Sequence, residues 1–178
     1  IALQGGDSAF MTALPDNILT DALIQEMRKL NVDASFIQRV NQGRFGIYFV
    51  ETGADQRGGT VTYDREGSSI ALQPGDSYPW AKACEGADWF HITGITPAIS
   101  KSAAAAALLA VQQAKTHGLT VSCDLNFRKK LWNWEPGTKP VDLARKTMKE
   151  ILNYVDVVIA NEEDAELTLG IGAPHTDV

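Results

Sequence analysis

The sequence predicts an α/β fold: a three-layer α/β/α domain, only partly present, from which a small β-sheet projects. From Ala87 onward, apolar strand-like runs alternate with helix-like segments, which is typical of parallel strands joined by crossover helices. Residues 45–65 differ, because two β-rich stretches there flank a polar loop that contains glycine. We therefore expect residues 1–40 and 73–178 to form the α/β core and residues 41–72 to form a β-hairpin insert.

The first forty residues contain one clear helix pattern. Residues 1–6 (IALQGG) are typical of the last turn of a helix and its glycine cap, so we expect the domain to begin upstream. Ser8–Ala13 is a short apolar strand candidate. Asp16–Leu30 is expected to be a helix with one apolar face, closed by Asn31, because its apolar residues recur at helical spacing: Ile18, Ala22, Leu23, Met27 and Leu30.

The insert combines aromatic side chains with a guanidinium. Phe45–Val50 and Thr60–Arg65 are rich in aromatic and β-branched residues. Side chains two residues apart on a strand share a face, so Tyr63 and Arg65 lie on the same face, and Tyr48 belongs to the opposing strand. Arginine beside hydroxyl groups suits a carboxylate or polyol ligand, since it can bind a carboxylate with two parallel hydrogen bonds. Alternatively, the aromatic pair only stabilises the hairpin.

The second half of the chain shows the alternation from which the α/β class is predicted. Apolar runs are separated by longer segments with helical periodicity, and one of these is rich in alanine. The closing residues Gly170–Val178 resemble a loop, so we expect the chain to break off between elements. The expected strands are Trp89–Thr93, Thr120–Cys123 and Val155–Ala160, and the expected helices are Ile99–His117, Val141–Asn153 and one that begins at Glu162.

Polar segments follow all three of these strands. They are Thr93–Pro97, Asp124–Arg128 and Asn161–Asp164. Taken alone, these segments also have structural explanations. Asp124 is equally consistent with a helix cap, and acidic residues such as those at 162–164 complement the dipole of a helix start. In an open parallel sheet, however, ligands bind beyond the carboxyl ends of the strands. Three polar endings on consecutive strands therefore predict a ligand site at one edge of the sheet.

Composition favours a small-molecule partner. A net charge of -6 and a pI near 5.0 argue against nucleic acid, whose binders need clustered positive charge. No apolar run reaches the length of about 18 residues that a membrane helix requires. The two cysteines have no partner at metal-ligand spacing, which favours a reduced, cytoplasmic setting. No GxxxxGK[ST] loop is present, so a P-loop nucleotidase is excluded over these residues.

Several strings resemble one family. DLNFRKKLW (residues 124–132) and FHITGITPAIS (residues 90–100) are similar to segments of the ribokinase-like, PfkB-type carbohydrate kinases, and most similar to those that phosphorylate 2-keto-3-deoxygluconate. GIYFVETG (46–53) and VTYDREGSSI (61–70) resemble the lid strands of these kinases, and ANEEDAEL (160–167) resembles their NxxE region. The resemblance covers nearly the whole chain and implies a partial ribokinase-like domain in which the hairpin is a lid.

The resemblance implies transfer of the γ-phosphoryl group of ATP, with Mg²⁺, to a terminal hydroxyl of a sugar acid, namely 2-keto-3-deoxygluconate. It implies that the lid residues Tyr48, Tyr63 and Arg65 hold the sugar acid. Arg128 would contact both this substrate and the nucleotide phosphate. A neutral sugar would not need these two arginines for a carboxylate, so the alternatives within the family are a fructokinase or a ribokinase.

The implied nucleotide residues are Asn126, which would face the nucleotide, together with Arg128 and Asn161. Asn161 would also help to organise magnesium and phosphate, and Asp164 would act on the metal indirectly. Asp164 departs from the NxxE pattern, because its side chain is one methylene shorter than the Glu of the family.

Other parts of the family pattern are absent from this chain. The resemblance places the catalytic Asp downstream and the glycine-rich substrate motif upstream, so the chain alone is expected to be inactive. It also implies a homo-oligomer that pairs through the lid. The alternative from another class is a non-catalytic domain that binds a sugar acid or a partner.

Overall fold

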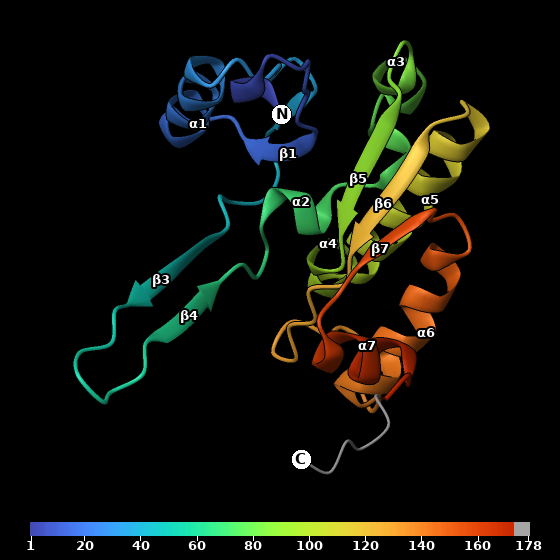
Figure 1. Ribbon diagram of the computed structural model, residues 1–178. Coiled ribbons are helices and arrows are strands. Elements are labelled where there is room, and N and C mark those ends of the chain that lie inside the picture. The colour runs from blue at the N-terminus through green and yellow to red at the C-terminus, as the bar shows by residue number, and fades with distance from the viewer. Residues whose placement is uncertain (173–178) are drawn as a thin grey trace. The chain divides into compact units, whose positions relative to one another are not determined.

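The computed structural model describes residues 1–172 and consists of two compact units, Ile1–Gln73 and Pro74–Val178 (Figure 1). Strands and helices alternate through the second unit, as the sequence predicts. The loop expected at Gly170–Val178 lies mostly outside the described residues. Whether residues 1–40 and 73–178 form one core stays a prediction. No helix within residues 1–172 is long and apolar enough to cross a membrane.

The first unit begins with a helical turn and a pair of parallel strands. The turn η1 (Ala2–Gln4) ends at Gly5, whose φ of 86° is the left-handed conformation of a glycine cap. Strand β1 (Thr12–Pro15) begins later than the expected strand at residues 8–13, and it pairs in parallel with β2 (Ile37–Val40). The sequence did not predict β2, because its IQRV pattern carries two polar residues and no hydrophobic alternation.

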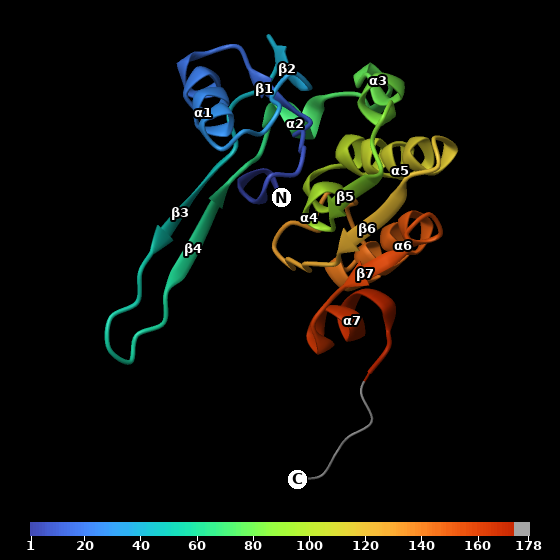
Figure 2. The ribbon, with the colours of Figure 1, turned by 45° about the horizontal axis from the view of Figure 1, so that its top comes forward.

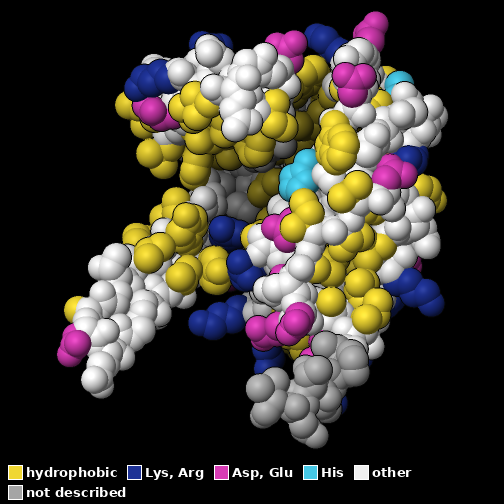
Figure 3. Space-filling model, in the orientation of Figure 1, with side chains coloured by type: hydrophobic (Ala, Val, Ile, Leu, Met, Phe, Trp, Pro, Cys, Tyr) yellow, Lys and Arg dark blue, Asp and Glu magenta, His cyan; other side chains and the backbone are white. Residues whose placement is uncertain are grey.

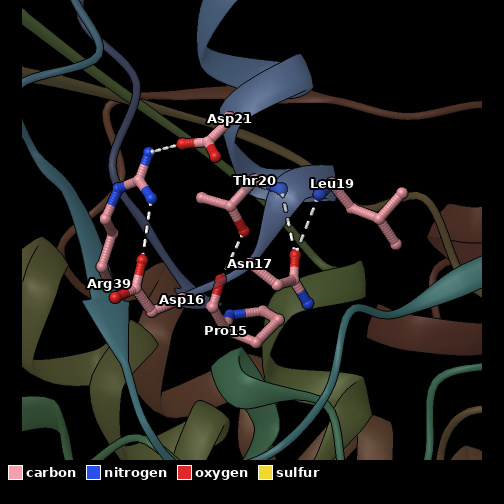
Figure 4. A network of polar contacts seen from close by, with 7 residues as sticks. All are labelled: Pro15, Asp16, Asn17, Leu19, Thr20, Asp21 and Arg39. Carbon is pink, nitrogen blue, oxygen red and sulfur yellow. Dashed lines mark hydrogen bonds and ion pairs between the residues drawn. The ribbon is translucent and has the colours of Figure 1, made fainter.

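Helix α1 (Ile18–Lys29) begins at a side-chain cap (Figure 4). The Oδ1 atom of Asn17 accepts hydrogen bonds from the backbone N–H groups of Leu19 at 3.0 Å and Thr20 at 3.2 Å. The fully buried Thr20 hydroxyl donates to the carbonyl of Pro15 at 2.5 Å, which ties the helix to the end of β1. The helix expected over residues 16–30 is therefore confirmed, with its first turn fixed by local hydrogen bonds.

A charged network links α1 to β2 on the surface of this unit (Figure 4). Arg39 of β2 forms ion pairs with Asp16, at 2.8 Å, and with Asp21 of α1. Apolar side chains of the helix, both strands and the loop before β2 form the small core of the unit. The buried members are Leu14, Ile24, Ala34 and Ile37.

The predicted hairpin is confirmed. Strands β3 (Ile47–Glu51) and β4 (Thr60–Asp64) pair in antiparallel register. At the base of the hairpin, Arg44 forms an ion pair with Asp64 and donates from Nε to the carbonyl of Glu66 at 2.7 Å. The Arg44 guanidinium holds the pKa of Asp64 below its ordinary value. In Figure 3, hydrophobic side chains gather along the strands, whereas the tip is mostly polar or backbone.

The second unit is built on a parallel sheet with strand order β5 (Trp89–Thr93), β6 (Thr120–Asp124) and β7 (Val157–Ile159). Helices α5 (Lys101–Thr116) and α6 (Pro140–Leu152) lie on the same face of this sheet in both ribbon views (Figures 1 and 2). Helix α5 can pack closely because the side chains on its buried face are small. They are Ala103, Ala104, Ala106, Ala107, Ala110, Val111 and Ala114.

Shorter elements complete both units. Helix α7 (Glu162–Leu169) follows β7 and begins where the sequence predicts it. The sequence patterns did not predict α2 (Ser69–Leu72), η2 (Gly75–Ser77), α3 (Trp80–Cys84) or α4 (Ile95–Ile99), because each is too short to show helical periodicity.

The opposite face of the sheet carries a polar contact among exposed side chains. The Ser122 hydroxyl lies 2.7 Å from Trp89 Nε1, which donates to it, and 2.8 Å from His91 Nδ1. Trp89 is 55% exposed, and Val157, the register partner of Ser122, is 40% exposed. Within residues 74–172, the sheet and one helix layer thus provide two of the three expected layers.

Candidate functional site

Two clusters contain the predicted site residues, one in each unit. In the hairpin, Tyr48 and Tyr63 are register partners with ring centroids 6.5 Å apart. The guanidinium carbon of Arg65 lies 5.1 Å from the centroid of the Tyr63 ring and 5.7 Å from that of Tyr48. The prediction that these three side chains share one face of the hairpin is confirmed. Tyr48 is 56% exposed, so the cluster is open to a ligand.

Arg65 differs from the other arginines of the hairpin. Arg44 is paired with Asp64, and Arg57 is paired with Glu51 at 2.6 Å. The Arg65 guanidinium contacts only aromatic rings among the interactions of residues 1–172, and no carboxylate of these residues pairs with it. Its planar group of N–H donors therefore remains available for an anion.

In the second unit, the backbone segments at the ends of β5 and β6 lie in close contact. Gly94 follows β5, and its backbone N–H donates to the carbonyl of Asp124 at 2.7 Å. A Cβ atom on Gly94 would lie only 2.1 Å from the carbonyl oxygen of Leu125. The missing side chain of Gly94 therefore allows the close approach of the backbone that follows β6. The two loops could not meet with any larger residue here.

Asn126 is the residue at which the chain turns after β6. Its φ of 40° is in the left-handed region, which asparagine tolerates better than most residues. Its side-chain amide lies 3.4 Å from Thr93 Oγ1, at the end of β5. The expected convergence of polar groups at this edge of the sheet is therefore observed between the first two strands.

The third polar segment joins the same edge through a buried contact. Asn161 caps α7, because its Oδ1 accepts the backbone N–H of Asp164 at 2.7 Å. The Asp164 side chain, 9% exposed, accepts the backbone N–H of Phe127 at 3.0 Å. The polar segments after all three strands are therefore held together, as the sequence predicts.

Arg128 lies beside this contact and is exposed to solvent. Its Nη1 donates only to the neighbouring carbonyl of Phe127, at 3.1 Å, among the contacts of residues 1–172. A guanidinium beyond the carboxyl end of a central strand can bind phosphate or carboxylate oxygens. The thiol of Cys123, within β6, is unsuited to chemistry because burial raises its pKa to about 12.

The described residues suit a phosphate group better than a directly bound metal ion. Arg128 and the amide of Asn126 are donors, which a phosphate needs. Residues 1–172 contain no group of three or more acidic, histidine or cysteine side chains placed to hold a cation. The one buried carboxylate at this edge, that of Asp164, already accepts a backbone N–H. These residues therefore do not provide the oxygen ligand set that Mg²⁺ prefers.

Comparison with known proteins gives one consistent result. A family model described as pfkB family carbohydrate kinase matches residues 1–177. A 2-dehydro-3-deoxygalactonokinase of Haloferax volcanii is 31% identical over 165 residues, which are 93% of this chain and 49% of that protein. A 2-dehydro-3-deoxygluconokinase of Thermoproteus tenax is 28% identical over 175 residues, which are 97% of this chain and 50% of that protein.

A solved structure gives the same result. The 2-dehydro-3-deoxygluconokinase of Thermotoga maritima superposes with a TM-score of 0.90 at 42% identity and covers 99% of this chain and 52% of that chain. The chain thus spans about half the length of the relatives that it matches.

Proposed function

The chain belongs to the PfkB family of carbohydrate kinases and has its ribokinase-like α/β fold, and on that premise we propose that it forms part of an ATP-dependent kinase for a sugar acid. The acid that we propose is 2-keto-3-deoxygluconate. The names of the relatives support a 2-dehydro-3-deoxy sugar acid, since that from Haloferax volcanii is named for the galactonate and that from Thermotoga maritima for the gluconate.

The observation that carries the proposal is the unpaired Arg65 guanidinium against two phenol rings. A neutral sugar is bound by hydroxyl and amide groups, whereas a carboxylate is bound most strongly by an arginine that is not already paired with another anion. Tyr48 and Tyr63 add hydroxyl groups on the same face of the hairpin. We propose that these three residues bind the carboxylate and the polyol end of the acid.

The proposed division of labour follows from the chemistry of phosphoryl transfer. The hydroxyl of the acid loses its proton, its oxygen bonds to the γ-phosphorus, and the bond from that phosphorus to the bridging oxygen breaks, so that ADP leaves. Arg128 stabilises the phosphoryl oxygens, and Asn126 faces the nucleotide. Magnesium would supply charge neutralisation when it is bound, and Asn161 and Asp164 would contribute only by positioning the backbone at the nucleotide, not as ligands of the ion. The base that takes the proton is expected outside this chain.

A substrate panel tests the proposal. The protein that carries this chain is expected to turn over 2-keto-3-deoxygluconate with a kcat/KM at least about tenfold above that of fructose or ribose, since a charge-assisted bond contributes roughly 1.5–3 kcal/mol. A coupled assay of ADP release measures all three sugars. Equal or faster turnover of a neutral sugar would show that the substrate is that of a fructokinase or a ribokinase. The assignment to the family would still hold.

We also propose that two copies pair through their hairpins. Phe49 is 59% exposed on the face of β3 opposite to Tyr48, by strand alternation, and an exposed large apolar side chain on a hairpin favours pairing with a second copy. Phe49→Ser is expected to convert a dimer to a monomer in sedimentation velocity. Val50→Ser is the matched control, because Val50 is 58% exposed on the same strand but on the face of Tyr48. A Phe49→Ser protein that remains dimeric would refute this interface.

The cytoplasmic setting stays part of the proposal. Cys84 and Cys123 are both free and buried, which suits a reducing compartment. Cell fractionation tests this location, and recovery of the protein from an exported fraction would contradict it.

A further inference from the structure

We infer that Asp164 is a positioning residue whose carboxylate fixes the turn after β6 through a backbone hydrogen bond, and that it does not act by binding a cation. The inference rests on the proposed function only in that the proposal places this turn at the nucleotide. The contact itself is a property of the fold. It assigns a role to the position at which the chain departs from the NxxE pattern of its family.

The contact joins two elements that are far apart in sequence. The Oδ1 atom of Asp164, in the first turn of α7, accepts the N–H of Phe127 at 3.0 Å across a separation of 37 residues. Both residues are buried, with exposed fractions of 9% for Asp164 and 8% for Phe127. A buried backbone N–H must have a partner, and this carboxylate provides it. Removing the acceptor would leave the amide unsatisfied within the core.

The turn that this bond supports is strained. Asn126 has a φ of 40°, a conformation that residues other than glycine rarely adopt. The amide before it, that of Leu125, donates to the carbonyl of Ile159 at 2.9 Å, and the amide after it donates to Asp164. The left-handed residue is therefore held on both sides by the segment that comprises β7 and the start of α7. Such strain persists only where the surroundings fix it.

The length of the Asp164 side chain suits this role. Asn161 is the N-cap of α7, so Asp164 occupies the third helical position. A Glu at that position commonly reaches back to the N–H of its own cap residue. Asp164 instead reaches across to the neighbouring turn. The substitution of Asp for Glu thus gives the carboxylate a partner on a different element.

The consequence for function concerns the two side chains next to the bond. Asn126 precedes Phe127 and Arg128 follows it, so the bonded amide lies between the two groups that we assign to the nucleotide. The Arg128 side chain makes only a local contact with the Phe127 carbonyl. Its direction is therefore determined mainly by the backbone that Asp164 fixes. Loss of the bond should weaken nucleotide binding without removing any group that contacts the nucleotide.

Three variants of the protein that carries this chain separate the possibilities. Asp164→Asn keeps an oxygen acceptor of the same shape but loses the negative charge that a cation ligand needs. Asp164→Ala loses the acceptor as well. Glu163→Ala is the matched control, because it removes one exposed carboxylate from the same helical turn. The measurements are hydrogen exchange of the Phe127 amide, the affinity for ATP without turnover, and the Mg²⁺ concentration for half-maximal activity.

We expect Asp164→Ala to speed exchange of the Phe127 amide by about five- to a hundredfold, because an unsatisfied buried donor opens more readily. ATP affinity should fall by about fivefold or more. Asp164→Asn should stay within about threefold of the parent protein in both measurements, and Glu163→Ala within about twofold. The Mg²⁺ requirement should be the same in all three variants.

The opposite pattern would overturn the inference. If Asp164 binds the cation, Asp164→Asn fails as badly as Asp164→Ala, both variants need more Mg²⁺, and Phe127 exchange does not change. Circular dichroism shows whether Asp164→Ala is folded, and the isosteric Asp164→Asn decides the question if it is not. Parent protein that binds no ATP would instead contradict the proposed function, while the exchange data would still decide the role of Asp164.

Discussion

Arg65→Ala is expected to lower kcat/KM for the sugar acid by about ten- to a hundredfold and to leave the KM for ATP nearly unchanged. A charge-assisted hydrogen bond contributes roughly 1.5–3 kcal/mol, and each 1.4 kcal/mol is about tenfold. The effect is specific to the acid, because only the acid presents a carboxylate to the hairpin. Steady-state kinetics with the acid and with a neutral sugar measure the difference.

Two further variants sharpen this result. Arg65→Lys should recover only part of the loss, since an ammonium group keeps the charge but cannot form two parallel hydrogen bonds or stack on the rings as a planar group. Arg57→Ala is the matched control in the same hairpin, because Arg57 is exposed and already paired with Glu51. If Arg65→Ala changes the kinetics of acid and neutral sugar alike by less than about twofold, Arg65 is only a solvated charge on the hairpin.

Gly94→Ala is expected to destabilise the protein by about 1–3 kcal/mol and to weaken ATP binding at the same time. The φ of Gly94 is ordinary for any residue, at -61°, so the cost is purely one of space. The added methyl would lie 2.1 Å from the Leu125 carbonyl oxygen, a backbone atom that cannot rotate away. The loops after β5 and β6 must separate, and Asn126 then loses its place beside Thr93.

Thermal unfolding and ATP titration measure the two effects of this change. Gly58→Ala is a suitable control, because no atom lies within 4 Å of the site of its added methyl. That variant should unfold within about 0.5 kcal/mol of the parent. A Gly94→Ala protein with unchanged stability and ATP affinity would show that the close approach of the two strand ends is dispensable.

The parallel strands of the second unit could be predicted because each is a short run containing apolar and β-branched residues between helix-like segments. Trp89–Thr93 matches β5 at both ends, and the edge of the sheet with the polar endings follows from the rule for strand ends. The shared face of Tyr63 and Arg65 follows from the two-residue period. These features depend on local pattern alone, which a sequence displays directly.

The features that escaped prediction depend on contacts between distant residues. Strand β2 has an IQRV sequence without alternation, and it forms only because β1 offers it a parallel partner. The bond from Phe127 to Asp164 spans 37 residues, and a single sequence gives no signal for such a pair. The left-handed Asn126 had one available clue, since asparagine directly after an apolar strand is a residue type that tolerates that conformation.

The transfer of a labelled phosphoryl group tests the central claim most directly. ATP carrying heavy oxygen in its γ-phosphoryl group would be incubated with 2-keto-3-deoxygluconate and the protein that carries this chain, and the products would be analysed by mass spectrometry. We predict a monophosphate of the acid that retains the labelled oxygens, with ADP formed in equal amount. Tight binding of the acid without any phosphorylated product would contradict the assignment and identify the protein as a sugar-acid binder that performs no transfer.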